Sequence, residues 1–247
     1  MSVLKVAALI SLSALVLVTP ASPAGSEEKK KPTYESEPRE SQTRPAATAA
    51  AVPVYRPPLR GAPGGRVGGG TRGTARAVFV LSALAPNHTG LTAGDQPSLY
   101  WFISSATPSP VELTVVDPRR EKPLLEARIP PPSQPGVQRI RLADYGVRLA
   151  PGVSYRWFVA VVPDPARRSR DILAGGTIER VEPQEELKGK LARATKTEHP
   201  FLYAEAGLWY DALIAISELI ETAPQDPAFR KQRAALMVQV GLPELGE

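Results

Sequence analysis

The chain has 247 residues and a formal net charge of +5, and it contains no cysteine. Without disulfides, the folded part must be held together by its core alone. Residues 27–76 contain ten Lys or Arg and five Asp or Glu, whereas residues 77–247 contain 19 basic and 20 acidic residues. A nucleic-acid-binding domain is expected to carry its basic residues on the folded part. The charge distribution therefore argues against a nucleic-acid partner.

Residues 1–24 have the pattern of a secretory signal peptide. Lys5 precedes an apolar run, residues 6–18, and small residues at 19–24 suit a signal peptidase. The run is shorter than the ~20 apolar residues that span a bilayer. We expect an exported, periplasmic or extracellular protein with no membrane span after cleavage. An uncleaved anchor is the alternative.

Residues 25–75 are predicted to form a disordered, basic linker rich in Pro, Gly and Ala. Such a composition offers little apolar surface to offset the entropy of ordering. Its end, residues 60–73, is dense in Gly and Arg. A phosphate-binding loop would need a preceding strand and a Gly-Lys-Ser/Thr ending, and both are missing. We expect a flexible lead-in, or one packed along a sheet where only glycine lets two backbones approach.

From residue 76 the pattern changes to short apolar runs separated by turn residues. Runs at this spacing are typical of an all-β sandwich. We predict an antiparallel, immunoglobulin-like β-sandwich domain over residues 76–182. Its seven strands are expected at residues 77–81, 99–104, 111–116, 124–129, 136–142, 154–162 and 177–181.

Residues 149–157 have the pattern Leu-x-Pro-Gly-x-x-Tyr-x-Trp. This pattern resembles the approach to strand F in fibronectin-type and immunoglobulin-like sandwiches, where a tyrosine bonds the backbone across a corner. The resemblance implies that Tyr155 is the corner residue and that Trp157 belongs to the core.

Residues 183–247 change to helical periodicity, which predicts a helical tail with helices at 183–194, 199–206, 209–222 and 226–240. Gly207 separates the middle two helices. That pair resembles a tetratricopeptide unit in the spacing of Tyr203, Gly207, Ala212, Ile216, Leu219 and Pro224. A solenoid needs about three repeats to bury a continuous face. We therefore expect the helices to pack on the sandwich or on a partner.

Several segments in order, including residues 66–73, 155–158, 164–171, 176–181 and 203–212, carry a family resemblance. Over residues 60–245 the chain resembles a bacterial family of exported proteins without assigned function, domain-of-unknown-function family 928. Family members often have Cys where Val162 or Pro163 stands here, so no role of a thiol carries over. The resemblance implies no catalytic residues.

The residues that could carry chemistry are few. His88 and His199 lie far apart in sequence and lack metal-ligand spacing. No Gly-x-Ser-x-Gly motif is present, so we expect no enzyme, metal or cofactor, with a hydrolase of unrecognised site as an alternative. Arg167, Arg168, Ser169 and Asp171 follow the longest strand and are candidates, with Arg180, for binding a small anionic ligand or glycan. The alternative is an ordered loop in which Asp164 or Asp171 pairs with Arg168.

Trp209 and Tyr210 flank the turn between the predicted middle helices. We expect one of them to be buried and the other to mark an interaction face. The first functional hypothesis is a non-enzymatic interaction module that binds a protein or cell-envelope component. The anionic-ligand or glycan site is the second hypothesis.

Overall fold

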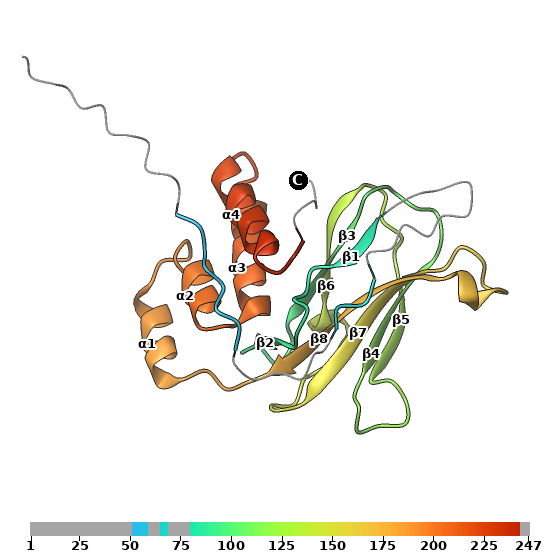
Figure 1. Cartoon of the computed structure of the whole chain (residues 1–247), viewed down its shortest axis with the longest axis horizontal. Coiled ribbons are helices and arrows are strands. Elements are labelled where there is room, and N and C mark those ends of the chain that lie inside the picture. Colours follow the sequence, from blue (N-terminus) through green and yellow to red (C-terminus); the bar gives the residue numbers. More distant parts are fainter. Residues whose placement is uncertain (1–50, 59–64, 69–79, 243–247) are drawn as a thin grey trace, which may run out of the picture. The chain divides into compact units, whose positions relative to one another are not determined.

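A computed structural model of the chain describes residues 51–58, 65–68 and 80–242. The predicted signal peptide, residues 1–24, and most of the predicted linker lie outside the described residues. The described part forms two β-sheets followed by four α-helices (Figure 1). This confirms the predicted class, a mainly β chain with helices at its C-terminal end.

The two sheets form a sandwich-like arrangement. The smaller is antiparallel, with the order β1–β3–β6: β1 (Leu81–Ala83), β3 (Ser98–Ile103) and β6 (Gly136–Arg141). The larger has the order β2–β8–β7–β4–β5, in which β2 is parallel to β8 and the other pairs are antiparallel. Its strands are β2 (Gly90–Thr92), β4 (Val111–Val116), β5 (Leu125–Ile129), β7 (Ser154–Val161) and β8 (Ile172–Arg180). The closer likeness to an immunoglobulin-like sandwich stays a prediction.

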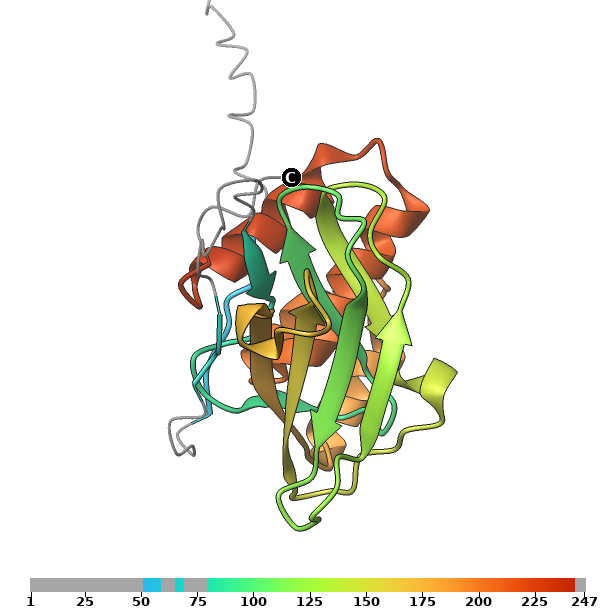
Figure 2. The ribbon, with the colours of Figure 1, turned by 90° about the vertical axis from the view of Figure 1, so that its right-hand side faces the viewer.

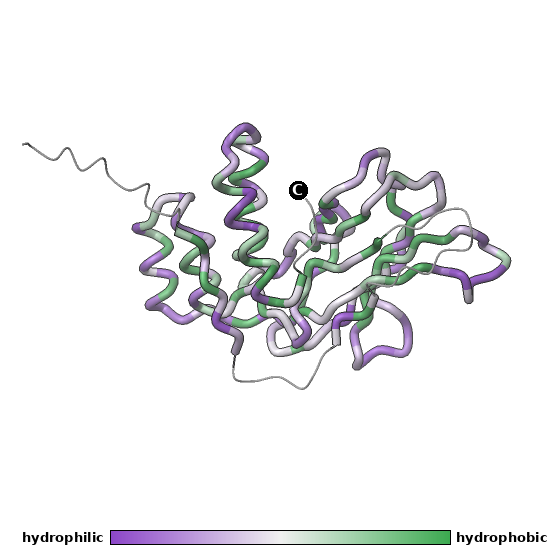
Figure 3. The backbone as a smooth tube through the Cα atoms, turned by 45° about the horizontal axis from the view of Figure 1, so that its top comes forward, coloured by the Kyte–Doolittle hydropathy of each residue, from purple (hydrophilic) through white to green (hydrophobic). Residues whose placement is uncertain are grey.

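Alternation along the strands gives the large sheet one core face and one outer face. On β7, Tyr155, Trp157 and Val159 are buried, whereas the intervening Arg156 is exposed and Phe158 is half-buried. Successive side chains of a strand point to opposite faces. Hydrophobic segments accordingly follow the strands, and hydrophilic segments gather in the connecting loops (Figure 3). The outer face of β7 and β8 is therefore the face that carries polar side chains.

Four helices follow the sheets: α1 (Glu185–Arg193), α2 (His199–Glu205), α3 (Trp209–Thr222) and α4 (Pro227–Val238). Their bounds agree with the predicted helices to within two residues. Helix α4 begins as expected, because the Asp226 carboxylate accepts a hydrogen bond from the Ala228 N–H at 2.8 Å.

Helix α3 covers the outer face of the small sheet, so β3 is buried on both faces. Arg139 on β6 reaches Glu218 and Glu221 of α3 at 3.3 and 3.1 Å. Its guanidinium also lies over the Tyr100 ring, 5.8 Å from the centroid. Figure 2 shows this layering, with the strands in front and the helices behind them. The predicted helical tail and the predicted sandwich thus share one hydrophobic core.

Two fully buried aromatic residues at the start of α3 join the helices to the sheets. The Trp209 indole N–H donates to the Leu84 carbonyl at 2.9 Å. The Tyr210 hydroxyl accepts from the Trp157 indole N–H at 2.9 Å and donates to the Thr177 carbonyl at 3.1 Å. Trp209 and Tyr210 therefore form a contact inside the chain, and neither presents an exposed interaction face.

Part of the predicted linker is packed on the fold. At residues 51–58 this corrects the expectation of a free spacer, whereas at residues 67–68 it agrees with the alternative of a lead-in packed along a sheet. The backbone N–H of Arg56 donates to the Ala204 carbonyl, and the Tyr55 ring is buried. Val67 pairs with Gly175 of β8 through two backbone hydrogen bonds. At Gly68, φ is +95° and a Cβ would lie 2.2 Å from the Leu173 carbonyl oxygen, so only glycine fits this close approach.

The region before β7 is held by a tyrosine bond across a corner. The Ala150 N–H donates to the Tyr155 hydroxyl at 3.1 Å, which is the kind of contact expected for this residue. Arg119 lies 3.4 Å from the same hydroxyl and makes a bidentate pair with Asp117. That pair lowers the pKa of Asp117 to about 2.

Candidate functional site

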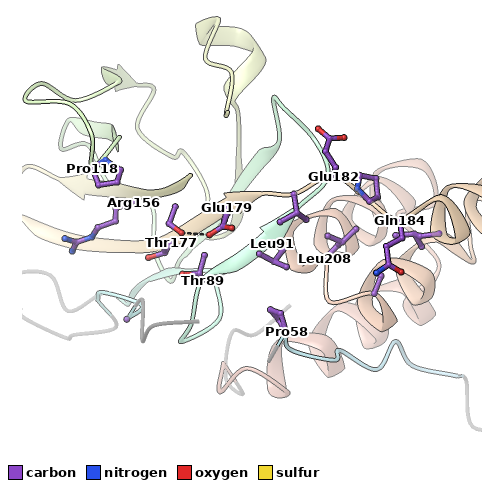
Figure 4. Close-up of a pocket in the computed structure, with 16 residues that line it drawn as sticks. Pro58, Thr89, Leu91, Pro118, Arg156, Thr177, Glu179, Glu182, Gln184 and Leu208 are labelled. Atoms are coloured by element: carbon purple, nitrogen blue, oxygen red, sulfur yellow. Dashed lines mark hydrogen bonds between the residues drawn. The ribbon is translucent and has the colours of Figure 1, made fainter. Parts of the chain in front are cut away.

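A cavity of about 890 Å³ lies between the outer face of the large sheet and the helices (Figure 4). Its floor comes from β2, β7 and β8. One wall comes from residues 181–184, from α1 and from the turn between α2 and α3, and Pro58 and Gly65 border it on another side. The volume is in the range of small-molecule sites, about 300–1,000 Å³.

Strand register explains the polar part of the floor. Arg156 pairs with Thr177, and Ser154 pairs with Glu179, so these four side chains share the outer face of β7 and β8. Thr89 lies beside this group, as Figure 4 shows. The floor therefore carries a guanidinium, a carboxylate and three hydroxyl groups within one patch.

The two charges of the floor have different surroundings. The Arg156 guanidinium lies 5.0 Å from the centroid of the Phe158 ring. Its side chain points away from Glu179 (Figure 4). In the part of the chain that the structure describes, Arg156 forms no ion pair. Glu179 accepts a hydrogen bond from the Ser154 hydroxyl at 2.5 Å. Arg156 is thus a cation that a bound anion could pair with.

The opposite part of the lining is apolar. It is lined by Leu91 of β2, by Val181 just after β8, by Leu187 of α1 and by Leu208 in the turn before α3. Gly207 shapes that turn, because its φ is +75° and a Cβ would lie 2.8 Å from the Arg56 carbonyl oxygen. The expected structural role of Gly207 is therefore to close the turn against the segment 51–58. The cavity joins a polar half to an apolar half.

The loop predicted to bind anions has its charges largely paired. Arg168 bonds Glu112 of β4 at 3.1 Å and Asp171 at 2.8 Å, which corresponds to the ordered-loop alternative. Arg167 lies 3.7 Å from Asp164, and Ser169 is exposed. Burial raises the pKa of Asp171, while the hydrogen bond from Arg168 lowers the pKa of Glu112.

Arg180 lies at the far end of β8 from this loop, nine residues from Asp171 and so roughly 30 Å along the strand. It donates to the Leu149 carbonyl at 3.3 Å and to Glu182 at 3.0 Å. The structure therefore does not bring Arg180 together with Arg167, Arg168, Ser169 and Asp171.

The histidines have separate structural contacts. His88 stacks on Tyr55 with its Nε2 2.9 Å from the tyrosine hydroxyl, and burial lowers the pKa of His88. His199 lies 3.3 Å from the Leu191 carbonyl oxygen. No group of three or more His, Asp or Glu side chains suited to a metal ion occurs within residues 51–58, 65–68 and 80–242. None of the helices there is long and apolar enough to cross a membrane.

The cavity residues Arg156, Thr177, Glu179 and Leu187 were not predicted from the sequence. The sequence did contain an indication for Arg156, because it is the single charged residue in an otherwise apolar strand and lies between Tyr155 and Trp157. The sequence contained no such indication for Leu187, since its place in the cavity lining depends on how the helices pack.

No curated protein matches the chain. One family model does match it, over residues 67–247, and its description is Domain of Unknown Function (DUF928). The match covers both sheets, all four helices and nearly all of the cavity lining. The chain therefore belongs to the DUF928 family, in agreement with the resemblance in its sequence.

Proposed function

We propose that the protein is an exported, non-catalytic binding module and that the cavity is where it holds a component of the cell envelope. One observation carries this proposal: an 890 Å³ cavity has a cation without an ion pair among the described residues, beside an apolar wall. Ligand sites are typically concave and mostly apolar, with a few polar groups that fix orientation. Export is supported by the leader-like pattern of residues 1–24.

The second hypothesis, an anionic ligand or glycan at residues 167–171, has less support. Arg168 already bonds two carboxylates, and an incoming anion would have to displace Glu112 or Asp171. Arg156 needs no such displacement, which favours the cavity over the loop.

The test places a photoreactive amino acid at Gln184, which lines the cavity, and at Glu126, which is exposed on β5. After irradiation of living cells, mass spectrometry of the purified chain measures adducts. We expect an adduct at Gln184 and none at Glu126. Ala206→Trp, which fills the cavity from an exposed position, should abolish the adduct, whereas Ala192→Trp on the exposed side of α1 should leave it. An adduct that survives Ala206→Trp would contradict the proposal.

A further inference from the structure

The charge at the Arg156 end of the cavity indicates the sign of the group that binds there. Glu182 pairs with Arg180, whereas Glu179 accepts a hydrogen bond from the Ser154 hydroxyl and keeps its negative charge. The Arg156 guanidinium contacts the face of the Phe158 ring, which holds the guanidinium in place without neutralising it. A guanidinium presents several N–H donors that suit carboxylate or phosphate oxygens. An anionic group is therefore the polar partner that this end of the cavity fits.

The position of Arg156 relative to Glu179 allows an anion to bind the guanidinium without lying next to the carboxylate. The two residues are diagonal neighbours across β7 and β8, since Arg156 pairs with Thr177 and Ser154 with Glu179. Arg156 points away from Glu179 (Figure 4), and its guanidinium lies over the Phe158 ring. An anion on the guanidinium would thus lie on the side away from the carboxylate. The path from that anion to Leu91 passes the hydroxyls of Thr89 and Thr177 and also Glu179, which is the register partner of Leu91.

The rest of the lining indicates an apolar remainder. Leu91, Leu187 and Leu208 come from β2, α1 and the α2–α3 turn and converge on the same space. An alkyl chain placed there would leave water for an apolar environment, which favours binding. A purely ionic ligand would leave this wall facing water.

We infer that the cavity binds an anionic amphiphile, with a carboxylate or phosphate head on Arg156 and an alkyl tail against Leu91, Leu187 and Leu208. This inference rests on the proposed function and specifies the class of envelope component. A phospholipid and a free alkyl acid or phosphate share this chemistry.

Calorimetric titration of the full chain with decyl phosphate, below its micellar concentration, tests the inference. Decanol carries the same tail without the charge, and decylamine carries the opposite charge. We expect decyl phosphate to bind at least tenfold more tightly than decanol, because hydrogen bonds between charged groups are stronger than those of a neutral hydroxyl. Decylamine should bind no more tightly than decanol. Each methylene added from octyl to decyl phosphate should tighten binding about fourfold.

Variants connect this preference to Arg156. Arg156→Gln should remove the advantage of decyl phosphate over decanol, and Arg156→Lys should restore part of it. Arg193→Gln, at an exposed position on α1, is the matched control. Thermal unfolding of each variant shows whether the fold is retained. Two results would overturn the inference. One is a folded Arg156→Gln variant that binds decyl phosphate as tightly as the wild type does, and the other is a wild type that binds decylamine as tightly as decyl phosphate.

Flotation with vesicles distinguishes the two sources. Binding to phosphatidylglycerol vesicles that Arg156→Gln abolishes would support a phospholipid ligand. Binding of decyl phosphate without vesicle binding would support a free amphiphile. If no amphiphile binds while the Gln184 adduct still depends on an open cavity, the inference fails and the proposed function stands.

Discussion

Asp211, in the first turn of α3, joins that helix to the end of β2. Its carboxylate accepts a hydrogen bond from the Ala93 N–H at 2.9 Å. Burial nevertheless raises the pKa of Asp211 to about 6. An unfolded Asp has a pKa of about 3.9, so the folded protein holds the proton more tightly between these two values.

The pH dependence of stability follows from this difference. As the pH rises from 4 to 7, the folded state must ionise a partly buried carboxylate, and the free energy of unfolding falls. We expect the stability of the wild type relative to Asp211→Asn to decrease by about 1–3 kcal/mol over this range. Urea unfolding of both proteins at several pH values measures it. A constant difference between the two proteins would contradict the prediction.

Two arginines show what single residues could and could not predict. The sequence indicated a binding site at residues 167–171 because several charged residues are adjacent there. In space, Glu112 lies 56 residues away and pairs with Arg168 across the sheet. Arg156 stands alone among apolar neighbours, and its significance depends on the absence of an ion pair among the described residues. Sequence proximity identifies charges but not their partners.

At the level of elements, the segment 51–58 behaves as part of the fold. The Tyr55 ring stacks on His88 and meets the edge of Trp209, with centroids 5.8 and 5.2 Å apart. Its backbone N–H donates to the Gln239 side chain at 2.8 Å. Pro-rich composition favoured a free spacer, but one buried aromatic and several backbone hydrogen bonds are enough to dock a short extended segment.

This docking predicts a large effect for one substitution. Tyr55→Ala should lower the free energy of unfolding by about 3 kcal/mol, because a buried aromatic ring is replaced by a cavity. Val54→Ala, at the neighbouring exposed position, should change stability by no more than about 0.5 kcal/mol. Chemical denaturation compares them. Similar stabilities for the two variants would show that the segment does not stabilise the fold.

The helices were predictable and one strand was not. A 3.6-residue period, Gly207 and the Asp226-Pro227 pair gave helix bounds close to those observed. The three-residue strand β2 is too short for an alternating pattern, and its parallel pairing with β8 is a long-range contact. Strand β8 begins at Ile172, five residues before the predicted start at Thr177. The prediction began too late because Gly175 and Gly176 interrupt the apolar pattern of the strand.

At the level of the whole described molecule, the sheets and helices share one core, whereas the prediction from the sequence placed a domain boundary at residue 182. Trp209 and Tyr210 belong to the same buried cluster as residues of both sheets. Gly176 lets Ala85 approach β8 closely beside Tyr210, because a Cβ there would lie 2.5 Å from the Ala85 Cβ and 3.4 Å from the Tyr210 hydroxyl. The cavity exists because the helices are fixed in this way beside the outer face of β2, β7 and β8. No local pattern could have predicted a site made by such packing.

The most direct test follows backbone amide chemical shifts by NMR while decyl phosphate is added to the full chain. The account predicts that the largest shifts occur around Thr89, Arg156, Thr177 and Leu187, and that they are small around Arg167–Asp171. Shifts concentrated at Arg167–Asp171, or spread evenly over the protein, would contradict it.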